Sequence, residues 1–140
     1  MPPRVLVDTN VIVGALRNPS GRSASGQVVQ NVLAAYWQGV CSTATYLETF
    51  EVLLRPEFQL PRQQVLDFME ALADAVEWSH PVACSLLLRD AGDQKWLNLL
   101  HGSRANALVT YNLRDFRPAL ERGYPVMPPA EALRVLAGTA

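Results

Sequence analysis

The chain has 140 residues, of which 49% are hydrophobic and 18% are charged, and its net charge is −1. A chain of this size can bury a core without disulfides or structural metal. Its net charge indicates no broad basic face for nucleic acid, so any contact with RNA is expected to be local. Its two isolated cysteines have no CxxC or Cys/His metal spacing, which favours a reducing compartment. We therefore expect one soluble, cytoplasmic domain over residues 1–140 with no membrane span.

Strands and helices alternate in the first half of the chain. Short continuous apolar runs predict strands buried on both faces, whereas apolar residues three or four positions apart predict amphipathic helices. Proline and glycine mark where these helices begin and end. The elements predicted in this way are a strand at Val5–Val7, helices at 11–16 and from Val28 through Tyr36, a strand at Val40–Cys41, and two helices, one ending before Pro56 and one beginning at Pro61.

The second half continues the alternation. Its predicted elements are a helix around Trp96–Leu100 closed by Gly102, a strand at Ala107–Tyr111, an edge strand at 124–127 and a last helix from Pro129 through Leu136. Strands that alternate with helices indicate an α/β fold with a mostly parallel sheet. The large aromatic side chains in these patterns are expected in the core or in an interface, namely Trp37, Trp78 and Trp96.

Acidic residues fall where open parallel sheets place their ligand sites, beyond the carboxyl ends of strands. Asp8 follows the first strand, Asp93 opens the helix before the strand at 107–111, and Asp115 follows that strand. Glu48 lies early in its own helix. Carboxylates gathered in one place repel one another unless a divalent cation such as Mg²⁺ or Mn²⁺ compensates their charge. The pattern therefore predicts metal-assisted phosphodiester hydrolysis.

Each acid also has a simpler interpretation. Asp8 is suited to cap the helix that follows it, because a carboxylate accepts hydrogen bonds from the exposed amides of a first turn. Asp90 and Asp93 share this option, and their positions favour Asp93 as the cation ligand and Asp90 as the cap. Asn112 and Asp115 are common turn residues. In addition, two arginines flank the loop after the first helix and are predicted to steer phosphates, namely Arg17 and Arg22.

Four segments of the chain resemble the PIN-domain family, the fold of VapC-type toxins in bacterial toxin–antitoxin pairs. They are Val5–Val11 with Asp8, Ser42–Pro56 with Glu48, Arg89–Leu97 with Asp93, and Leu108–Phe116. The resemblance implies a three-layer α/β/α fold with about five strands, frequent homodimers and dependence on Mg²⁺ or Mn²⁺. It also implies single-stranded RNA as the substrate, and many such proteins are inhibited by a small antitoxin protein.

The positions of the acids and the resemblance together define the predicted active site. The catalytic and metal-binding acids are Asp8, Glu48, Asp93 and Asp115, and the residues that support them by hydrogen bonds are Asn10, Thr110 and Asn112. Many members carry an aspartate where Asn112 stands. We therefore predict that Asp115, three residues further along, supplies the fourth carboxylate.

Two other functions remain open at this point. A phosphatase similar to the haloacid-dehalogenase group would use Asp8 as a covalent nucleophile, but it would need an acid where Asn10 stands. A PIN-like domain that has lost catalysis would only bind RNA or protein, and Asn112 in place of an acid favours this alternative.

Overall fold

A computed structural model describes residues 1–136 of the chain. Its strands are β1 (Arg4–Val7), β2 (Gln38–Cys41), β3 (Glu77–Trp78), β4 (Ala107–Val109) and β5 (Val126–Met127). Its helices are α1 (Thr9–Arg17), α2 (Ala24–Leu33), α3 (Thr43–Leu53), α4 (Arg62–Ala75), α5 (Ala91–Ser103), α6 (Arg117–Glu121) and α7 (Pro129–Val135), together with a short 3-10 helix at Pro56–Phe58.

The five strands form one parallel sheet in the order β3-β2-β1-β4-β5. The central strand is β1, in which Val5 pairs with Gly39 of β2 and with Ala107 of β4. From β1 the chain first adds strands on one side and then returns to add β4 and β5 on the other. Strand order therefore reverses between β1 and β4, and the carboxyl end of this pair is where such sheets place their ligand sites.

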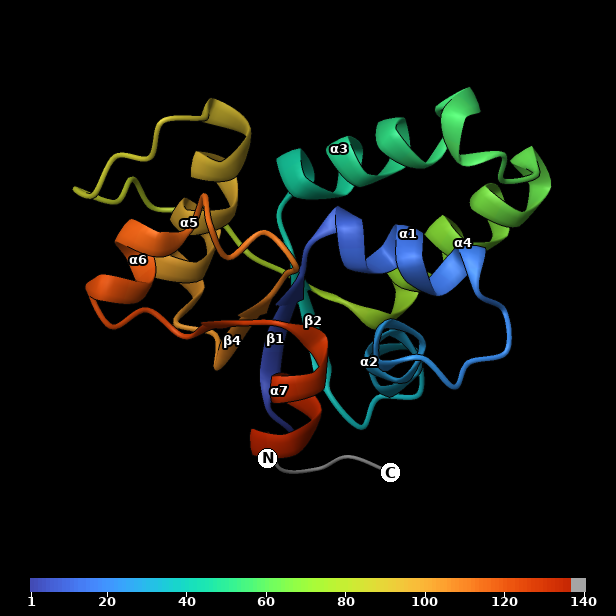
Figure 1. Ribbon diagram of the computed structural model, residues 1–140, viewed down its shortest axis with the longest axis horizontal. Coiled ribbons are helices and arrows are strands. Elements are labelled where there is room, and N and C mark those ends of the chain that lie inside the picture. The colour runs from blue at the N-terminus through green and yellow to red at the C-terminus, as the bar shows by residue number, and fades with distance from the viewer. Residues whose placement is uncertain (137–140) are drawn as a thin grey trace.

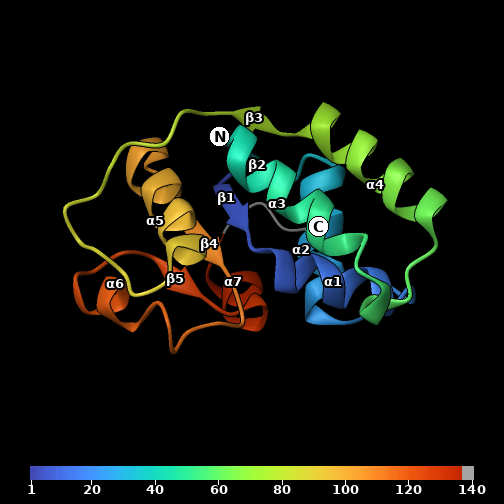
Figure 2. The same cartoon turned by 90° about the horizontal axis from the view of Figure 1, so that it is seen from above.

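Helices cover both faces of the sheet (Figures 1 and 2). Alternate residues of β1 point to opposite faces. Val5 packs into a core formed with α1, α2, α4 and α7, whereas Leu6 packs into a second core formed with α5 and α6. The predicted three-layer α/β/α arrangement with a parallel sheet is confirmed.

The predicted edge strand at 124–127 begins only at Val126. Two other predicted elements end two or three residues before their expected last residue. The helix expected to run through Tyr36 stops at Leu33, because Ala35 adopts a left-handed backbone with φ of 64°. The strand expected to reach Tyr111 ends at Val109. The backbone N–H of Tyr111 donates to a side chain and not to a neighbouring strand.

Two short elements, β3 and α6, were not predicted from the sequence. β3 has two residues and α6 has five, so neither contains enough positions to show a periodic pattern. The tryptophans also differ among themselves, because Trp37 and Trp96 are buried but Trp78 on the edge strand β3 is 49% exposed. Trp78 therefore does not belong to the core.

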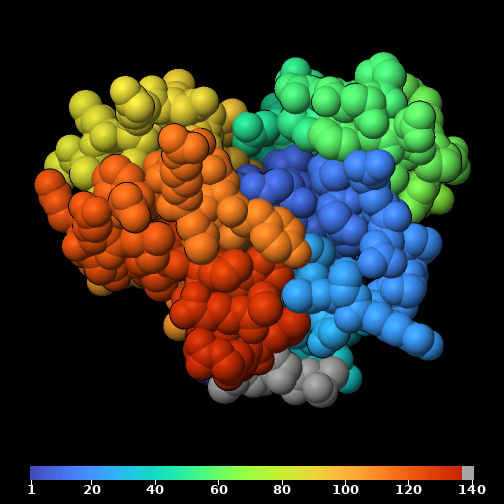
Figure 3. Space-filling view, viewed as in Figure 1, coloured from blue at the N-terminus to red at the C-terminus, as the bar shows by residue number. Residues whose placement is uncertain are grey.

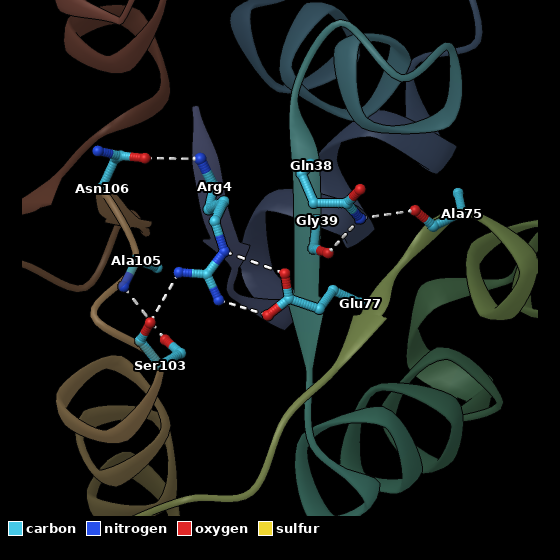
Figure 4. Close-up of polar contacts among 8 residues, drawn as sticks. All are labelled: Arg4, Gln38, Gly39, Ala75, Glu77, Ser103, Ala105 and Asn106. Carbon is cyan, nitrogen blue, oxygen red and sulfur yellow. Dashed lines mark hydrogen bonds and ion pairs between the residues drawn. The ribbon is translucent and has the colours of Figure 1, made fainter. Parts of the chain in front are cut away.

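A polar network fixes the amino end of the sheet (Figure 4). The Arg4 guanidinium pairs with both carboxylate oxygens of Glu77 on β3 and donates to the carbonyl of Ser103 at 2.7 Å. The Arg4 backbone N–H donates to Asn106 Oδ1 at 2.7 Å. These contacts tie β1 to β3 and to the end of α5 at the edge of the sheet opposite the acids.

Candidate active site at the carboxyl edge of the sheet

Asp8 occupies the centre of the carboxyl edge, directly after β1, and is 8% exposed. Its Oδ1 accepts from the Thr9 backbone N–H at 2.7 Å, and its Oδ2 accepts from Thr110 Oγ1 at 2.8 Å. Burial raises the pKa of Asp8, and the hydrogen bonds from Thr110 and Thr9 oppose that rise. Asp8 does cap α1, but each of its oxygens retains a further lone pair for a ligand.

Thr110 organises the polar groups around Asp8. Besides donating to Asp8, its Oγ1 accepts from Asn10 Nδ2 at 3.3 Å and from the Asn112 backbone N–H at 3.0 Å. Asn10 Oδ1 in turn accepts from the Tyr111 backbone N–H at 3.2 Å. The Asn10 side chain thus bridges α1 to the loop after β4 and contacts the hydroxyl that holds Asp8.

Glu48 reaches the same edge from α3. A buried hydrogen bond of 2.9 Å between the hydroxyls of Thr9 and Thr49 fixes α3 against α1. Glu48 Oε2 accepts from the indole N–H of Trp96 at 2.8 Å, and its Oε1 lies 3.7 Å from the ammonium of Lys95. Both partners come from α5, so Glu48 links the helices on the two sides of the site.

The first turn of α5 contributes two more acids. Asp90 is the N-cap and accepts from the backbone N–H two residues later at 2.6 Å, which leaves Asp93 without a capping role. The pKa of Asp93 is raised from 3.8 to about 6 by burial and by the charges of Asp90, Asp115, Asp8 and Glu48. Residues far apart in the sequence thus surround Asp93 with negative charge.

Asp115 and Asp93 line a cavity of about 590 Å³ between the start of α5 and the turn before α6. The space-filling view shows a recess at this edge, between the segment before α5 and helix α3, with the start of α1 at its base (Figure 3). Within residues 1–136 the Asp115 carboxylate accepts no hydrogen bond from a backbone amide, so its placement there does not have the contacts expected of a turn-forming aspartate.

The acids have the chemistry that a hard divalent cation requires. Carboxylate oxygens are the preferred ligands of Mg²⁺ and Mn²⁺, and burial, together with the charges of the neighbouring acids, raises the pKa of Asp93. Within residues 1–136, however, no three His, Cys, Asp or Glu side chains are close enough to share one ion. A cation site would therefore require acidic side chains at this edge to rotate toward one another.

The arginines predicted to steer phosphates lie away from this edge. Arg17 is in the last turn of α1, which begins at the Asp8 cap, so its backbone stands about 13 Å along the helix at about 1.5 Å per residue. Arg22 lies in the loop before α2. Neither residue lines the cavity that contains Asp93 and Asp115.

Sequence reasoning missed two partners of Glu48. The sequence patterns assign no role in the site to Lys95 and place Trp96 in the core or in an interface. Trp96 follows Asp93 by three positions, so both lie on one face of α5, and this spacing was the available signal. Nothing in the sequence indicated that this face meets Glu48, because that contact depends on how α3 and α5 pack.

The geometry agrees with a comparison to known protein families, in which residues 4–114 match the PIN domain. The chain belongs to the PIN domain family. PIN domains are typically nucleases and generally use divalent metals, which accords with the acids gathered at the carboxyl edge. None of the curated proteins compared with this PIN domain matches it significantly. Among residues 1–136, no helix has the length and apolar character needed to cross a bilayer.

Proposed function

We propose that the protein is an endoribonuclease that cleaves single-stranded RNA with Mg²⁺ or Mn²⁺. The observation that carries this proposal is the environment of Asp93, which receives the negative charge of Asp8, Glu48, Asp90 and Asp115 within a nuclease family. Such crowding raises the energy of the cation-free protein and is relieved when a cation binds.

The residues divide the work of the proposed reaction. Asp8, Glu48, Asp93 and Asp115 would hold the cation, which when bound activates a water and neutralises charge on the phosphate. Thr110 keeps the Asp8 carboxylate in one orientation by donating to Oδ2. Trp96 holds Oε2 of Glu48, so the oxygen that faces Lys95, Oε1, is the one available to a cation.

The direct test is cleavage of a labelled single-stranded RNA with Mg²⁺ or Mn²⁺, and with a chelator. We expect cleavage with either ion, none with the chelator, and none from Asp8→Asn or Asp93→Asn. Asn is also a good N-cap, so Asp8→Asn preserves the start of α1. The matched control is Asp67→Asn, which removes an exposed acid on α4 and should cleave like the parent. Full activity in chelator, or in Asp93→Asn, contradicts the proposal.

A PIN domain that binds RNA without cleaving it is the second candidate. It is favoured by Asn112 at a position where many relatives carry an acid, and by the spread of the acids, no three of which within residues 1–136 are close enough to share one ion. The same assay separates the two functions, because this candidate predicts binding of RNA with no cleavage in either metal. Membership of the PIN domain family removes the phosphatase alternative.

The biological role belongs to the same proposal and rests on the resemblance to VapC-type toxins. In this proposed role the protein is a cytoplasmic toxin that forms homodimers and is inhibited by a small antitoxin protein. We expect induced expression of the protein to arrest growth, and co-expression of a small protein encoded beside it to restore growth. Asp93→Asn should not arrest growth. Arrest by Asp93→Asn would separate toxicity from RNA cleavage.

A further inference from the structure

Three arginines line the cavity that holds Asp93 and Asp115. They are Arg89, Arg114 and Arg117, and all three are exposed. Within residues 1–136 none of their guanidinium groups forms an ion pair or a side-chain hydrogen bond. Because cations on a protein surface beside several carboxylates usually pair with them, unpaired arginines at this position are available to an external anion.

The fold brings these arginines together from two segments. Arg89 lies just before α5. Arg114 lies in the turn before α6, and Arg117 is the first residue of α6. The three residues therefore border one cavity of about 590 Å³ that also contains Asp93 and Asp115. A cavity of this volume lies within the range of sites that enclose small ligands.

The arginines at this cavity offset the repulsion between the acids and the phosphates of RNA. The acids repel a polyanion, and the net charge of the chain is −1. Arginine offers a planar pair of donors that matches the oxygens of a phosphate, which a lysine ammonium cannot reproduce. Positive charge directly beside the acids attracts the phosphates that flank the cleaved bond.

The same cavity has an apolar lip. Leu87 is 77% exposed and lines the cavity together with Leu88 and Pro118. A single strand presents both phosphates and the apolar faces of unpaired bases, whereas a duplex keeps its bases stacked inside. Arginines beside exposed apolar side chains therefore match a single strand.

We propose that Arg89, Arg114 and Arg117 bind the phosphates of single-stranded RNA adjacent to the cleaved bond, with an unpaired base against Leu87. The inference rests on the proposed ribonuclease function and places the substrate on the α5–α6 side of the site. It replaces the expectation that the strand is steered by the loop after α1.

The test compares two triple variants of equal charge. One replaces Arg89, Arg114 and Arg117 by Gln, and the other replaces the equally exposed Arg17, Arg22 and Arg62 by Gln. Binding of a labelled single-stranded oligoribonucleotide is measured by fluorescence anisotropy in chelator at several salt concentrations, so that no cleavage occurs. Urea unfolding of each variant confirms that it is folded.

The cavity triple variant should bind more weakly and lower the slope of log affinity against log salt by about 2, since each lost phosphate contact on a single strand contributes about 0.7. The control triple variant should keep the parental slope. The single variant Arg117→Gln, which lowers the slope by about 0.7, serves if the triple variant unfolds. A duplex of the same sequence should compete poorly, and Leu87→Ser should weaken binding without changing the slope.

The outcomes are distinguishable from failure of the proposed function. If the parent cleaves RNA but the control triple variant loses as much slope as the cavity triple variant, or more, the proposed binding surface is wrong while the nuclease stands. A duplex that competes as well as the single strand overturns the assignment to unpaired RNA. If the parent neither binds nor cleaves RNA, both proposals fail together.

Discussion

Asp93→Asn should make the cation-free protein more stable while it abolishes cleavage. Raising the pKa of Asp93 from 3.8 to about 6 means that ionised Asp93 destabilises the folded chain. At about 1.4 kcal/mol for each tenfold change in an acid constant, the ceiling is about 3 kcal/mol. Asp93 is partly exposed, so solvent screening reduces the expected gain to about 1 kcal/mol. Asparagine keeps the shape of the side chain and removes the charge.

The pH dependence of stability follows from the raised pKa of Asp93. Below pH 3.8 Asp93 is protonated in both the folded and the unfolded chain, so it costs no stability there. Between pH 3.8 and about 6 the unfolded chain loses the proton while the folded chain retains it, and the stability of the parent falls as the pH rises through this window. Above that window the penalty is complete. The gain from Asp93→Asn should therefore be near zero at pH 4 and greatest at pH 8.

Urea unfolding of the parent and Asp93→Asn at pH 4 and pH 8, in chelator, measures this gain as a difference in free energy of unfolding. Asp67→Asn on α4 is the control, and it should show no such dependence on pH. Added Mn²⁺ should stabilise the parent more than Asp93→Asn, because binding to the folded state adds stability. An Asp93→Asn protein that is less stable than the parent at pH 8, or that gains equally at both pH values, would refute the reasoning.

Three further predictions concern the partners of the acids. Thr110→Val should lower the free energy of unfolding by about 1–3 kcal/mol, because buried Asp8 loses a donor, and should reduce cleavage about 10-fold to 100-fold. Thr110→Ser should keep the stability and the activity of the parent. Equal behaviour of the Thr110→Val and Thr110→Ser variants would contradict the role of the hydroxyl. Trp96→Phe should weaken Mn²⁺ binding about tenfold in calorimetry, because Glu48 loses the donor that orients it, and unchanged affinity would remove Trp96 from the site. Lys95→Gln should instead strengthen Mn²⁺ binding a few-fold, since the ammonium no longer competes for Glu48, and weaker binding would show that Lys95 supports the site.

The sequence determined the fold class and the acids. Apolar runs such as Val5–Val7 and the helical spacing of apolar residues are local properties, so they predict β1 and most helices without knowledge of packing. The carboxyl ends of parallel strands meet at one edge of a sheet, and this rule alone brings Asp8 and Asp115 to a common region. Two-residue β3 and five-residue α6 could not be predicted, because so few positions carry no periodicity.

Tertiary packing decided the contacts that surround these acids. The pairing of Glu48 with Trp96 depends on the approach of α3 to α5, and no local pattern in either helix reports it. The grouping of the unpaired arginines also depends on tertiary packing, because Arg89 and Arg117 come together only when the segment before α5 folds against α6. Local sequence sets which residues end each strand or begin each helix, whereas the charge that one side chain receives from another falls off with their distance in space, which only the folded chain defines.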